Sequence, residues 1–146
     1  MKKFELTSEF VTFLGKKLFR IKALVAFGDV KEGELGGFVE KEENLDQSGN
    51  AWVSGNARVS GNARVSGNAH IQCRRDCSAA SCFGSENRTT TFFREKDGGI
   101  GVRCGCFYGT MSEFREKVKE RHGDSRLAKE YLMLADLMEF RLSKDE

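Results

Sequence analysis

Phosphate-binding groups gather just before a predicted strand in the second half of the chain. A Gly84-Ser85 turn leads to Arg88 and to the hydroxyls of Thr89 and Thr90. Backbone N–H groups of such turns, guanidinium forks and threonine hydroxyls are the groups with which proteins hold phosphate. The pattern therefore predicts an anion site. The alternative is a solvated strand whose charges pair across a hairpin, since such polar turns also occur without ligands.

Three more residues extend this predicted site. Arg94 and Arg103 belong to the same predicted hairpin, and His122 precedes a second predicted helix, where unpaired N–H groups point outward. Asp124 weighs against the helix terminus, because its carboxylate would cap that terminus itself. The complete predicted ligand-binding set is Ser85, Asn87, Arg88, Thr90, Arg94, Arg103 and His122.

Five cysteines and two histidines suggest two other kinds of chemistry. Ligands for a tetrahedral zinc site would come from Cys73, Cys77, Cys82, Cys104, Cys106 and His122, but their spacing lacks the paired C-x2-C arrangement typical of such sites. We interpret them as buried thiols of a small core. A cysteine nucleophile activated by His122 needs a contact and a lowered thiol pKa that the sequence does not indicate. With no Walker, dinucleotide, HExxH or GxSxG motif, we predict no metal site, catalytic residue or cofactor.

Composition narrows the classes of partner. The chain has 24 Lys and Arg against 22 Asp and Glu, a balance that argues against binding nucleic acid through net charge. Apolar runs are too short for a membrane span, and the first residues alternate like a strand instead of forming a signal peptide. We therefore expect a cytoplasmic protein with reduced cysteines.

A six-residue unit written four times organises the middle of the chain. It reads GNAWVS-GNARVS-GNARVS-GNAHI from Gly49 to Ile71, with the large aliphatic residues six apart. Helices need a spacing near 3.6, and a hairpin strand would not break at a Gly-Asn every six residues. The pattern predicts a chain wound round a triangular prism, with valines inside and Gly-Asn corners that tolerate positive φ.

The variable positions of the repeat lie outside this predicted prism. Three units make one turn, so Trp52 and His70 are predicted to meet on one face, with Arg58 and Arg64 on the other two. Trp and Arg are enriched at interface hot spots, so these four residues are predicted to form a contact surface. The alternative for Trp52 is packing beneath the N-terminal segment.

The flanking segments give the rest of the predicted fold. Residues 1–45 alternate like a small β-hairpin or meander and are expected to cap the prism. Residues 88–95 and 100–107 form a predicted hairpin around Lys96-Asp97-Gly98-Gly99. Two antiparallel helices follow, the first beginning at a capping box of Thr110 and Glu113. We predict a mainly β fold in two units, residues 1–83 with a short left-handed parallel β-helix turn and residues 84–146 with the hairpin and two helices.

Three segments of the chain resemble known proteins. The repeat is similar to the left-handed parallel β-helix of hexapeptide proteins, and LFRIKAL…FGDVKEGELGGFVEKEENLDQSGNAWV looks like the segment that leads into the repeats of phage and prophage proteins. The tail GSENRTTTFFREKDGG…CGCFYGTMSEFREKVKERHGD…AKEYLMLADL looks like a recurrent phage and prophage segment, which implies no particular activity. Many hexapeptide proteins are trimeric acyltransferases, and that resemblance would offer His70 as a base. A solvent-facing His70 is the interpretation we favour, because fold alone does not supply function.

These observations lead to a functional hypothesis. We expect a non-catalytic phage-derived protein that sequesters a phosphate-bearing small molecule, such as a nucleotide immune signal, or blocks a host defence protein. The alternatives are a virion or assembly component and a hexapeptide-type acyltransferase. We also expect a homo-oligomer, a trimer about the prism axis, because one prism turn leaves open strand edges and apolar ends.

Overall fold

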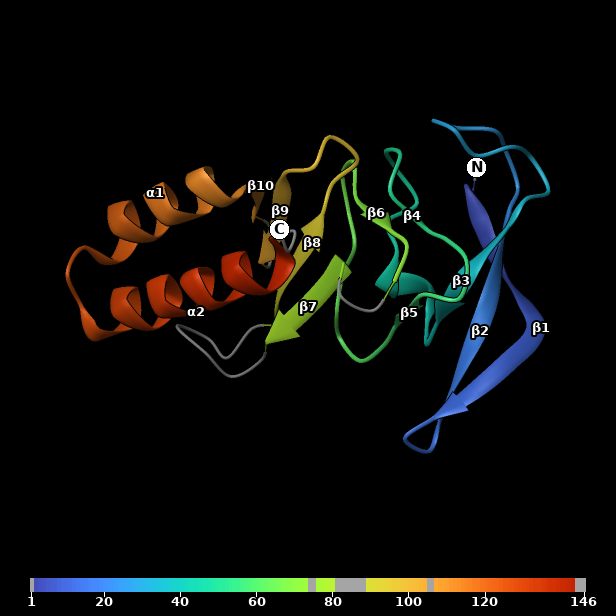
Figure 1. Cartoon of the computed structure of the whole chain (residues 1–146), viewed down its shortest axis with the longest axis horizontal. Helices are drawn as coiled ribbons and strands as arrows, with labels where there is room; N and C mark the ends of the chain where they lie inside the picture. The colour runs from blue at the N-terminus through green and yellow to red at the C-terminus, as the bar shows by residue number, and fades with distance from the viewer. Residues whose placement is uncertain (1, 74–75, 81–88, 105–106, 144–146) are drawn as a thin grey trace.

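Strands from the N-terminal and central parts of the chain form three sheets, and two helices follow. A computed structural model describes residues 2–73, 76–80, 89–104 and 107–143. The hairpin of β1 and β2 lies at one end of the long axis and the helices at the other, with the repeat and the C-terminal sheet between them (Figure 1).

The first sheet joins the N-terminal segment to the repeat. Its order is β1 (Phe4–Phe13), β2 (Lys16–Ala23), β3 (Leu35–Val39) and β5 (Arg58–Val59). The first two pairings are antiparallel, whereas β3 and β5 run parallel. The sheet is therefore mixed, and only its last strand comes from the repeat.

The predicted left-handed β-helix is wrong. Only two-residue strands form in the repeat, and β4 (Trp52–Val53) pairs with β6 (His70–Ile71) in a separate two-stranded parallel sheet. The two middle units instead pair upstream of the repeat, Val59 with Val39 of β3 and Val65 with Leu45 through an isolated bridge. Among the four units, only the first and the fourth pair with each other, through β4 and β6. Segments outside the repeat supply the strand partners of the other two units, so the repeat does not form a solenoid.

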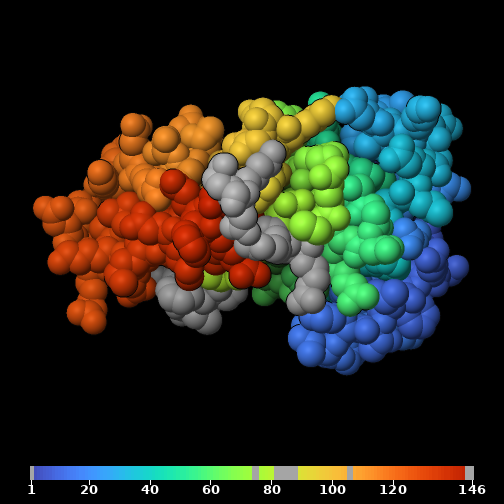
Figure 2. Space-filling model, in the orientation of Figure 1, coloured from blue at the N-terminus to red at the C-terminus, as the bar shows by residue number. Residues whose placement is uncertain are grey.

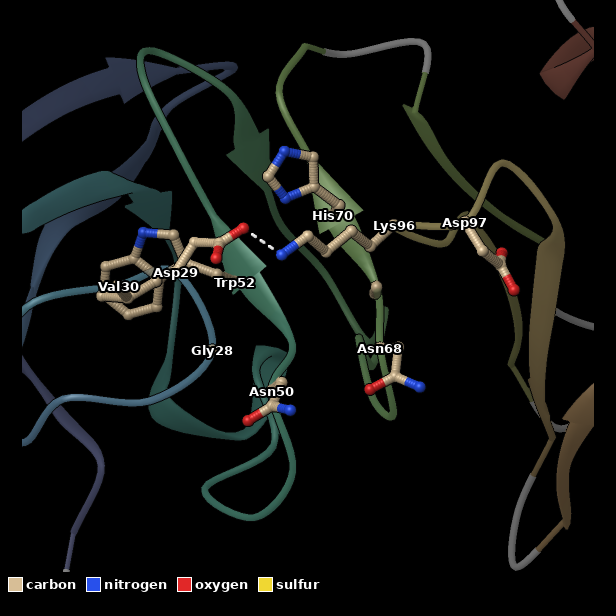
Figure 3. A pocket seen from close by; sticks show the side chains of 10 residues that line it. Gly28, Asp29, Val30, Asn50, Trp52, Asn68, His70, Lys96 and Asp97 are labelled. Carbon is tan, nitrogen blue, oxygen red and sulfur yellow. Dashed lines mark hydrogen bonds and ion pairs between the residues drawn. The ribbon is translucent and has the colours of Figure 1, made fainter.

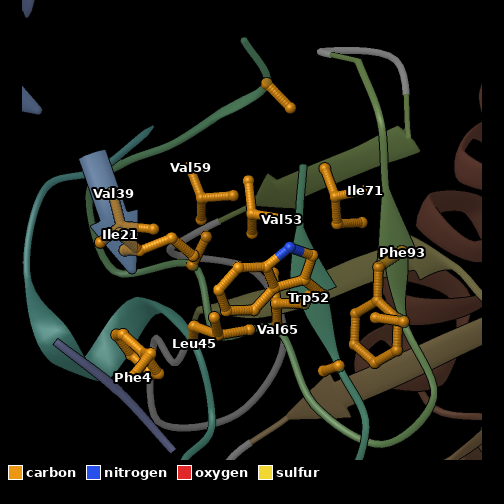
Figure 4. Packing of buried hydrophobic residues seen from close by; sticks show 14 of the residues in the cluster. Phe4, Ile21, Val39, Leu45, Trp52, Val53, Val59, Val65, Ile71 and Phe93 are labelled. Carbon is orange, nitrogen blue, oxygen red and sulfur yellow. The ribbon is translucent and has the colours of Figure 1, made fainter. Parts of the chain in front are cut away.

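Two local features of the repeat are nevertheless confirmed. Trp52 lies opposite His70 in the register, as predicted. The aliphatic residues point into a common interior, and Figure 4 shows this side-chain cluster. The large aliphatic residues of the four units are Val53, Val59, Val65 and Ile71, each at most 3% exposed.

The rest of the chain covers this interior. Phe4, Ile21 and Val39 pack on one side of the repeat and Phe93 on the other (Figure 4). A short 3-10 helix, η1 (Glu42–Asn44), leads into Leu45, which belongs to the same cluster. Flanking segments thus cover the apolar surfaces on which the trimer expectation depended; the trimer itself stays a prediction.

The last sheet is antiparallel and carries the helices. Its order is β10 (Phe107–Thr110), β9 (Ile100–Cys104), β8 (Thr90–Arg94) and β7 (Cys77–Ala80). Two helices follow, α1 (Met111–His122) and α2 (Arg126–Leu142). The predicted capping box is confirmed, because Thr110 accepts from the Glu113 amide while the Glu113 carboxylate accepts from the Thr110 amide.

Strand β8 separates two hydrophobic clusters. Phe93 packs into the repeat cluster, whereas Phe92 packs against Phe114 of α1 with ring centroids 5.7 Å apart. Strand β7 precedes the predicted boundary after residue 83 yet pairs with β8 beyond it. That boundary stays a prediction, with residues 81–88 outside the described ranges. Neither helix has the length and apolar character needed to cross a membrane, as far as the described residues extend.

Candidate functional site

The predicted phosphate site lies partly outside the described residues. Ser85, Asn87 and Arg88 belong to the range 81–88, which the structure does not describe. Thr90 is described, and its side chain is buried at 1% exposure. Its hydroxyl donates to Cys104 Sγ at 3.2 Å. The Thr90 hydroxyl therefore bonds inside the protein and does not face solvent.

The two arginines of the predicted site lie on opposite faces of the sheet. Arg94 pairs with Ile100 and Arg103 with Thr91, and side chains alternate between faces along each strand. Arg94 donates to the carbonyl of Leu142 at the end of α2 and forms an ion pair with Asp76 at 3.5 Å. The prediction that Arg94 joins Arg103 in one site is therefore wrong.

Arg103 faces the repeat instead of the helices. Its Nη1 donates to Ser66 Oγ at 2.8 Å and lies 3.6 Å from the carboxylate of Asp46. His122, the remaining member, stacks on Tyr131 of α2 with centroids 5.7 Å apart. The described members of the predicted set, Thr90, Arg94, Arg103 and His122, are therefore not brought together.

The predicted contact surface on the repeat also divides. Trp52 is only 3% exposed and packs edge-on against Phe27 at 5.4 Å, so it lies under the N-terminal segment and not on the exterior. The guanidinium of Arg58 lies 5.7 Å from the centre of the Phe13 ring. Arg64 is exposed. The half-buried His70 enters a pocket that sequence reasoning did not find.

The described cysteines are not all buried thiols: Cys73 is exposed, and Cys77 and Cys104 are half-buried. Burial raises the pKa of the Cys77 thiol to about 12, and the neighbouring Asp76 carboxylate adds to this rise. A thiol with such a pKa stays protonated at neutral pH and is a poor nucleophile. Within the described ranges no three His, Cys, Asp or Glu side chains gather as a metal site would require. Cys82 and Cys106 lie outside those ranges.

A pocket of about 290 Å³ lies where three distant parts of the chain meet (Figure 3). One part is the loop before β3, the second is the first and fourth copies of the repeat, which pair through β4 and β6, and the third is the turn between β8 and β9. The lining residues are Gly28, Asp29, Val30, Asn50, Trp52, Asn68, Ala69, His70, Lys96 and Asp97.

The register of the repeat builds one wall of this pocket. The backbone N–H of Asn50 donates to the carbonyl of Gly67 at 3.1 Å, and the backbone N–H of Trp52 donates to the carbonyl of Ala69 at 3.1 Å. The parallel register of β4 and β6 therefore sets Asn50 beside Asn68 and Trp52 beside His70. The Lys96 amide then donates to the carbonyl of Asn68 at 3.0 Å, which fixes the β8–β9 turn against the repeat.

Charges of opposite sign meet across the pocket. The Lys96 ammonium reaches over to the carboxylate of Asp29, and the imidazole of His70 lies close to the same point (Figure 3). The hydrogen bond from Lys96, followed by the charge of that ammonium and the nearby His70, lowers the pKa of the Asp29 carboxyl. The space between Lys96 and His70 is therefore a favourable position for an anion, which Asp29 occupies from an exposed loop.

The second carboxylate of the pocket has another role. Asp97 accepts from the Gly99 amide at 2.8 Å and so belongs to the turn. Figure 3 shows its carboxylate directed away from the Lys96–Asp29 pair. It therefore leaves the charge balance at the anion position to Lys96, His70 and Asp29.

Sequence reasoning could have found part of this pocket. The repeat period already aligns Asn50 with Asn68, and the Lys96-Asp97 turn was recognised as a turn. Nothing in the sequence indicated that the loop of Asp29 returns to this place, because that contact depends on how the N-terminal sheet packs.

No protein-family model matches this chain, and no curated protein matches it.

Proposed function

We propose that this protein is a non-catalytic binding protein that sequesters a phosphate-bearing small molecule in the pocket between Asp29, His70 and Lys96. One observation carries the proposal. The carboxylate of Asp29 lies beside Lys96 and His70, and because the Asp29 side chain is exposed, it can swing out into solvent. The Asp29 side chain is 76% exposed. Exposed ion pairs contribute little stability, so a competing anion can displace this carboxylate at low cost.

A phosphate group suits this exchange better than a carboxylate does. It carries more negative charge at neutral pH and three acceptor oxygens, so it can accept from Lys96 and His70 together. The amides of Asn50 and Asn68 lie along the same wall and offer donors and acceptors to the remainder of the ligand. A volume of about 290 Å³ matches a mononucleotide or a phosphorylated sugar and is too small for a polymer.

Among the described residues, the lining offers no serine, threonine or cysteine that could act as a nucleophile, which supports binding over covalent catalysis through such a group. The resemblance to phage proteins motivates the biological part of the proposal: capture of a host nucleotide signal would counter defence. Blocking a host defence protein and service as a virion component are the alternatives that the same resemblance suggests.

The direct test is calorimetry with inorganic phosphate, nucleoside monophosphates, cyclic nucleotides and NAD-derived nucleotides. Replacement Lys96→Ala should weaken binding of the ligand by about tenfold or more, because it removes a charge-assisted hydrogen bond. Replacement Asp29→Asn should strengthen binding, because the competing carboxylate is lost while the side-chain shape is kept. Lys119→Ala, at an exposed lysine of α1, is the matched control and should leave affinity unchanged.

Two results would overturn the proposal. One is no heat of binding with any of these compounds in the wild type and in Asp29→Asn. The other is binding that Lys96→Ala and Lys119→Ala weaken equally. Turnover of acetyl-CoA that disappears in His70→Ala would instead favour the acyltransferase alternative.

A further inference from the structure

Helix α2 carries three large apolar side chains that are exposed to solvent. Met133 is 71% exposed, Leu137 58% and Phe140 81%. The opposite face is buried against α1 and the last sheet. Helix α2 lies at the surface of the molecule, as the red and orange spheres in Figure 2 show.

The spacing of these three residues matches a helix-pairing seam. Positions four and then three residues apart fall on one stripe of an α-helix, as in the contact line between two packed helices. Isolated exposed apolar residues need no explanation, but three large ones on one stripe of a polar protein mark an interaction site. We name Met133, Leu137 and Phe140 the α2 stripe.

We infer that the α2 stripe is a homodimer interface, in which α2 packs antiparallel against α2 of a second copy about a two-fold axis near Leu137. A two-fold interface uses the same patch on both copies, so one self-complementary stripe is sufficient. In this arrangement Leu137 meets Leu137 of the second copy, and Met133 meets Phe140 of the second copy.

The charges beside the stripe favour this orientation. Glu130 and Arg141 lie on the same flank of the stripe, one near each end, by the helical period of α2. Antiparallel packing brings Glu130 near Arg141 of the second copy, and symmetry repeats the pair at the other end. Parallel packing about a two-fold axis along the helices would instead put this flank of the two copies on opposite sides of the seam, so Glu130 and Arg141 would not pair across it.

The other flank does not oppose the pairing. Asp136 lies near the proposed axis, but Arg115 of α1 donates to its carboxylate at 2.8 Å and neutralises it. Arg141 donates to Ser78 Oγ at 2.8 Å within one copy, and its guanidinium keeps further N–H groups for a second partner. Three side chains from each copy give a contact smaller than stable dimers use, so we expect weak, concentration-dependent association.

Sedimentation equilibrium over a wide concentration range tests this inference. The wild type should shift from monomer to dimer as concentration rises. Leu137→Asp should abolish the shift, whereas Leu35→Asp, which changes another exposed leucine in β3 at 53% exposure, should leave it intact. A wild type that stays monomeric, or two leucine variants that behave alike, would overturn the inference. A trimer unaffected by Leu137→Asp would do the same.

Charge reversal tests the orientation separately. Glu130→Arg and Arg141→Glu should each weaken the dimer, and the double variant should restore it, because the antiparallel pair is rebuilt with reversed signs. Leu137→Cys should also form a disulfide-linked dimer on mild oxidation that the wild type does not form. Failure of the double variant to restore association, together with no Leu137→Cys crosslink, would contradict an antiparallel two-fold interface.

Discussion

The two faces of the last sheet contact different parts of the molecule through side chains of β8 and β9. On one face, Phe92 and Arg94 of β8 tie the sheet to the helices, through the Phe114 ring and the Leu142 carbonyl. On the other face, Phe93 and Arg103 tie it to the repeat, through the aliphatic cluster and Ser66. Each face thus combines one buried aromatic ring with one arginine.

The two faces differ in whether they support the pocket. The face toward the repeat also supports the turn that carries Lys96. Phe93 stacks on Tyr108 with centroids 6.1 Å apart, and the Tyr108 hydroxyl donates to Glu95, the residue before Lys96. The face toward the helices has no such link to the pocket in the described chain. Changes on the two faces should therefore have similar costs in stability and different consequences for the pocket.

The largest effects should come from the two phenylalanines. Phe92→Ala and Phe93→Ala each remove a ring with 0% exposure, so each should lower the free energy of unfolding by about 3–5 kcal/mol in urea titrations. Only Phe93→Ala should speed hydrogen exchange of the Lys96 amide beyond what the loss of global stability explains, because that amide pairs with the repeat. Equal exchange rates in both variants would show that the faces are not separate.

The two arginines should separate the faces more sharply. Arg94→Ala leaves the carboxylate of Asp76, whose side chain is 9% exposed, without its ion-pair partner, and we expect a loss of about 2–3 kcal/mol. Arg103→Ala leaves Asp46 at 34% exposure, where water replaces the guanidinium, and removes the donor to the buried Ser66 hydroxyl, so about 1–2 kcal/mol should be lost. Thermal unfolding of the two variants measures this difference, and a larger loss for Arg103→Ala would reverse the ranking.

The opposite placement of these arginines depends on a shift of one residue in the hairpin. A turn of Lys96 to Gly99 alone predicts that Glu95 pairs with Ile100, and that register would put Arg94 and Arg103 on the same face. In the structure the Glu95 amide donates to the Gly99 carbonyl, so Glu95 belongs to the turn and Arg94 pairs with Ile100. The shift by one residue puts Arg103 opposite Thr91 and on the other face, and the sequence pattern did not indicate it.

The strand partners of the repeat and the position of the pocket could not be predicted from the sequence. The burial pattern of the repeat followed from its six-residue period, but the partners of Val59 and Val65 lie in Val39 and Leu45, outside the repeat. The pocket depends on where the Asp29 loop comes to rest. Both depend on long-range packing, which no local pattern encodes.

Two glycines of the repeat share a backbone conformation and differ in their surroundings. Gly55 and Gly67 have nearly the same backbone, with φ of 60° and 64°. An added methyl group would meet open space at Gly55, whereas at Gly67 it would run into the hydroxyl and ring of Tyr108. Gly55→Ala should cost about 1 kcal/mol from backbone strain alone, and Gly67→Ala about 2 kcal/mol. The pair Gly67→Ala with Tyr108→Ala should remove the excess, and if the excess persists, the Tyr108 contact is not its cause.

The smallest effect concerns Lys3, on the repeat side of the molecule. Its side chain is buried at 4% exposure, and its ammonium donates to the Ala51 carbonyl at 2.8 Å. Burial lowers the pKa of Lys3 to about 8 from 10.5, against a smaller opposing effect of Asp46. Between these two pH values the unfolded chain holds a proton that the folded protein has released. Stability contributed by Lys3 should therefore rise from pH 8 to pH 10, by about 1 kcal/mol once screening by nearby solvent is included.

Lys3→Met provides the control for this pH dependence. Methionine fills a similar volume and has no proton to lose, so the slope between pH 8 and pH 10 should be flatter than in the wild type, as measured by urea unfolding at each pH. The ammonium also has two carbonyl partners, Gly49 and Ala51, which Lys3→Met leaves without it. The variant should therefore gain no stability at pH 7, despite the removal of a buried charge. Identical slopes in both proteins would mean that the folded state keeps Lys3 charged, with its pKa near the ordinary value.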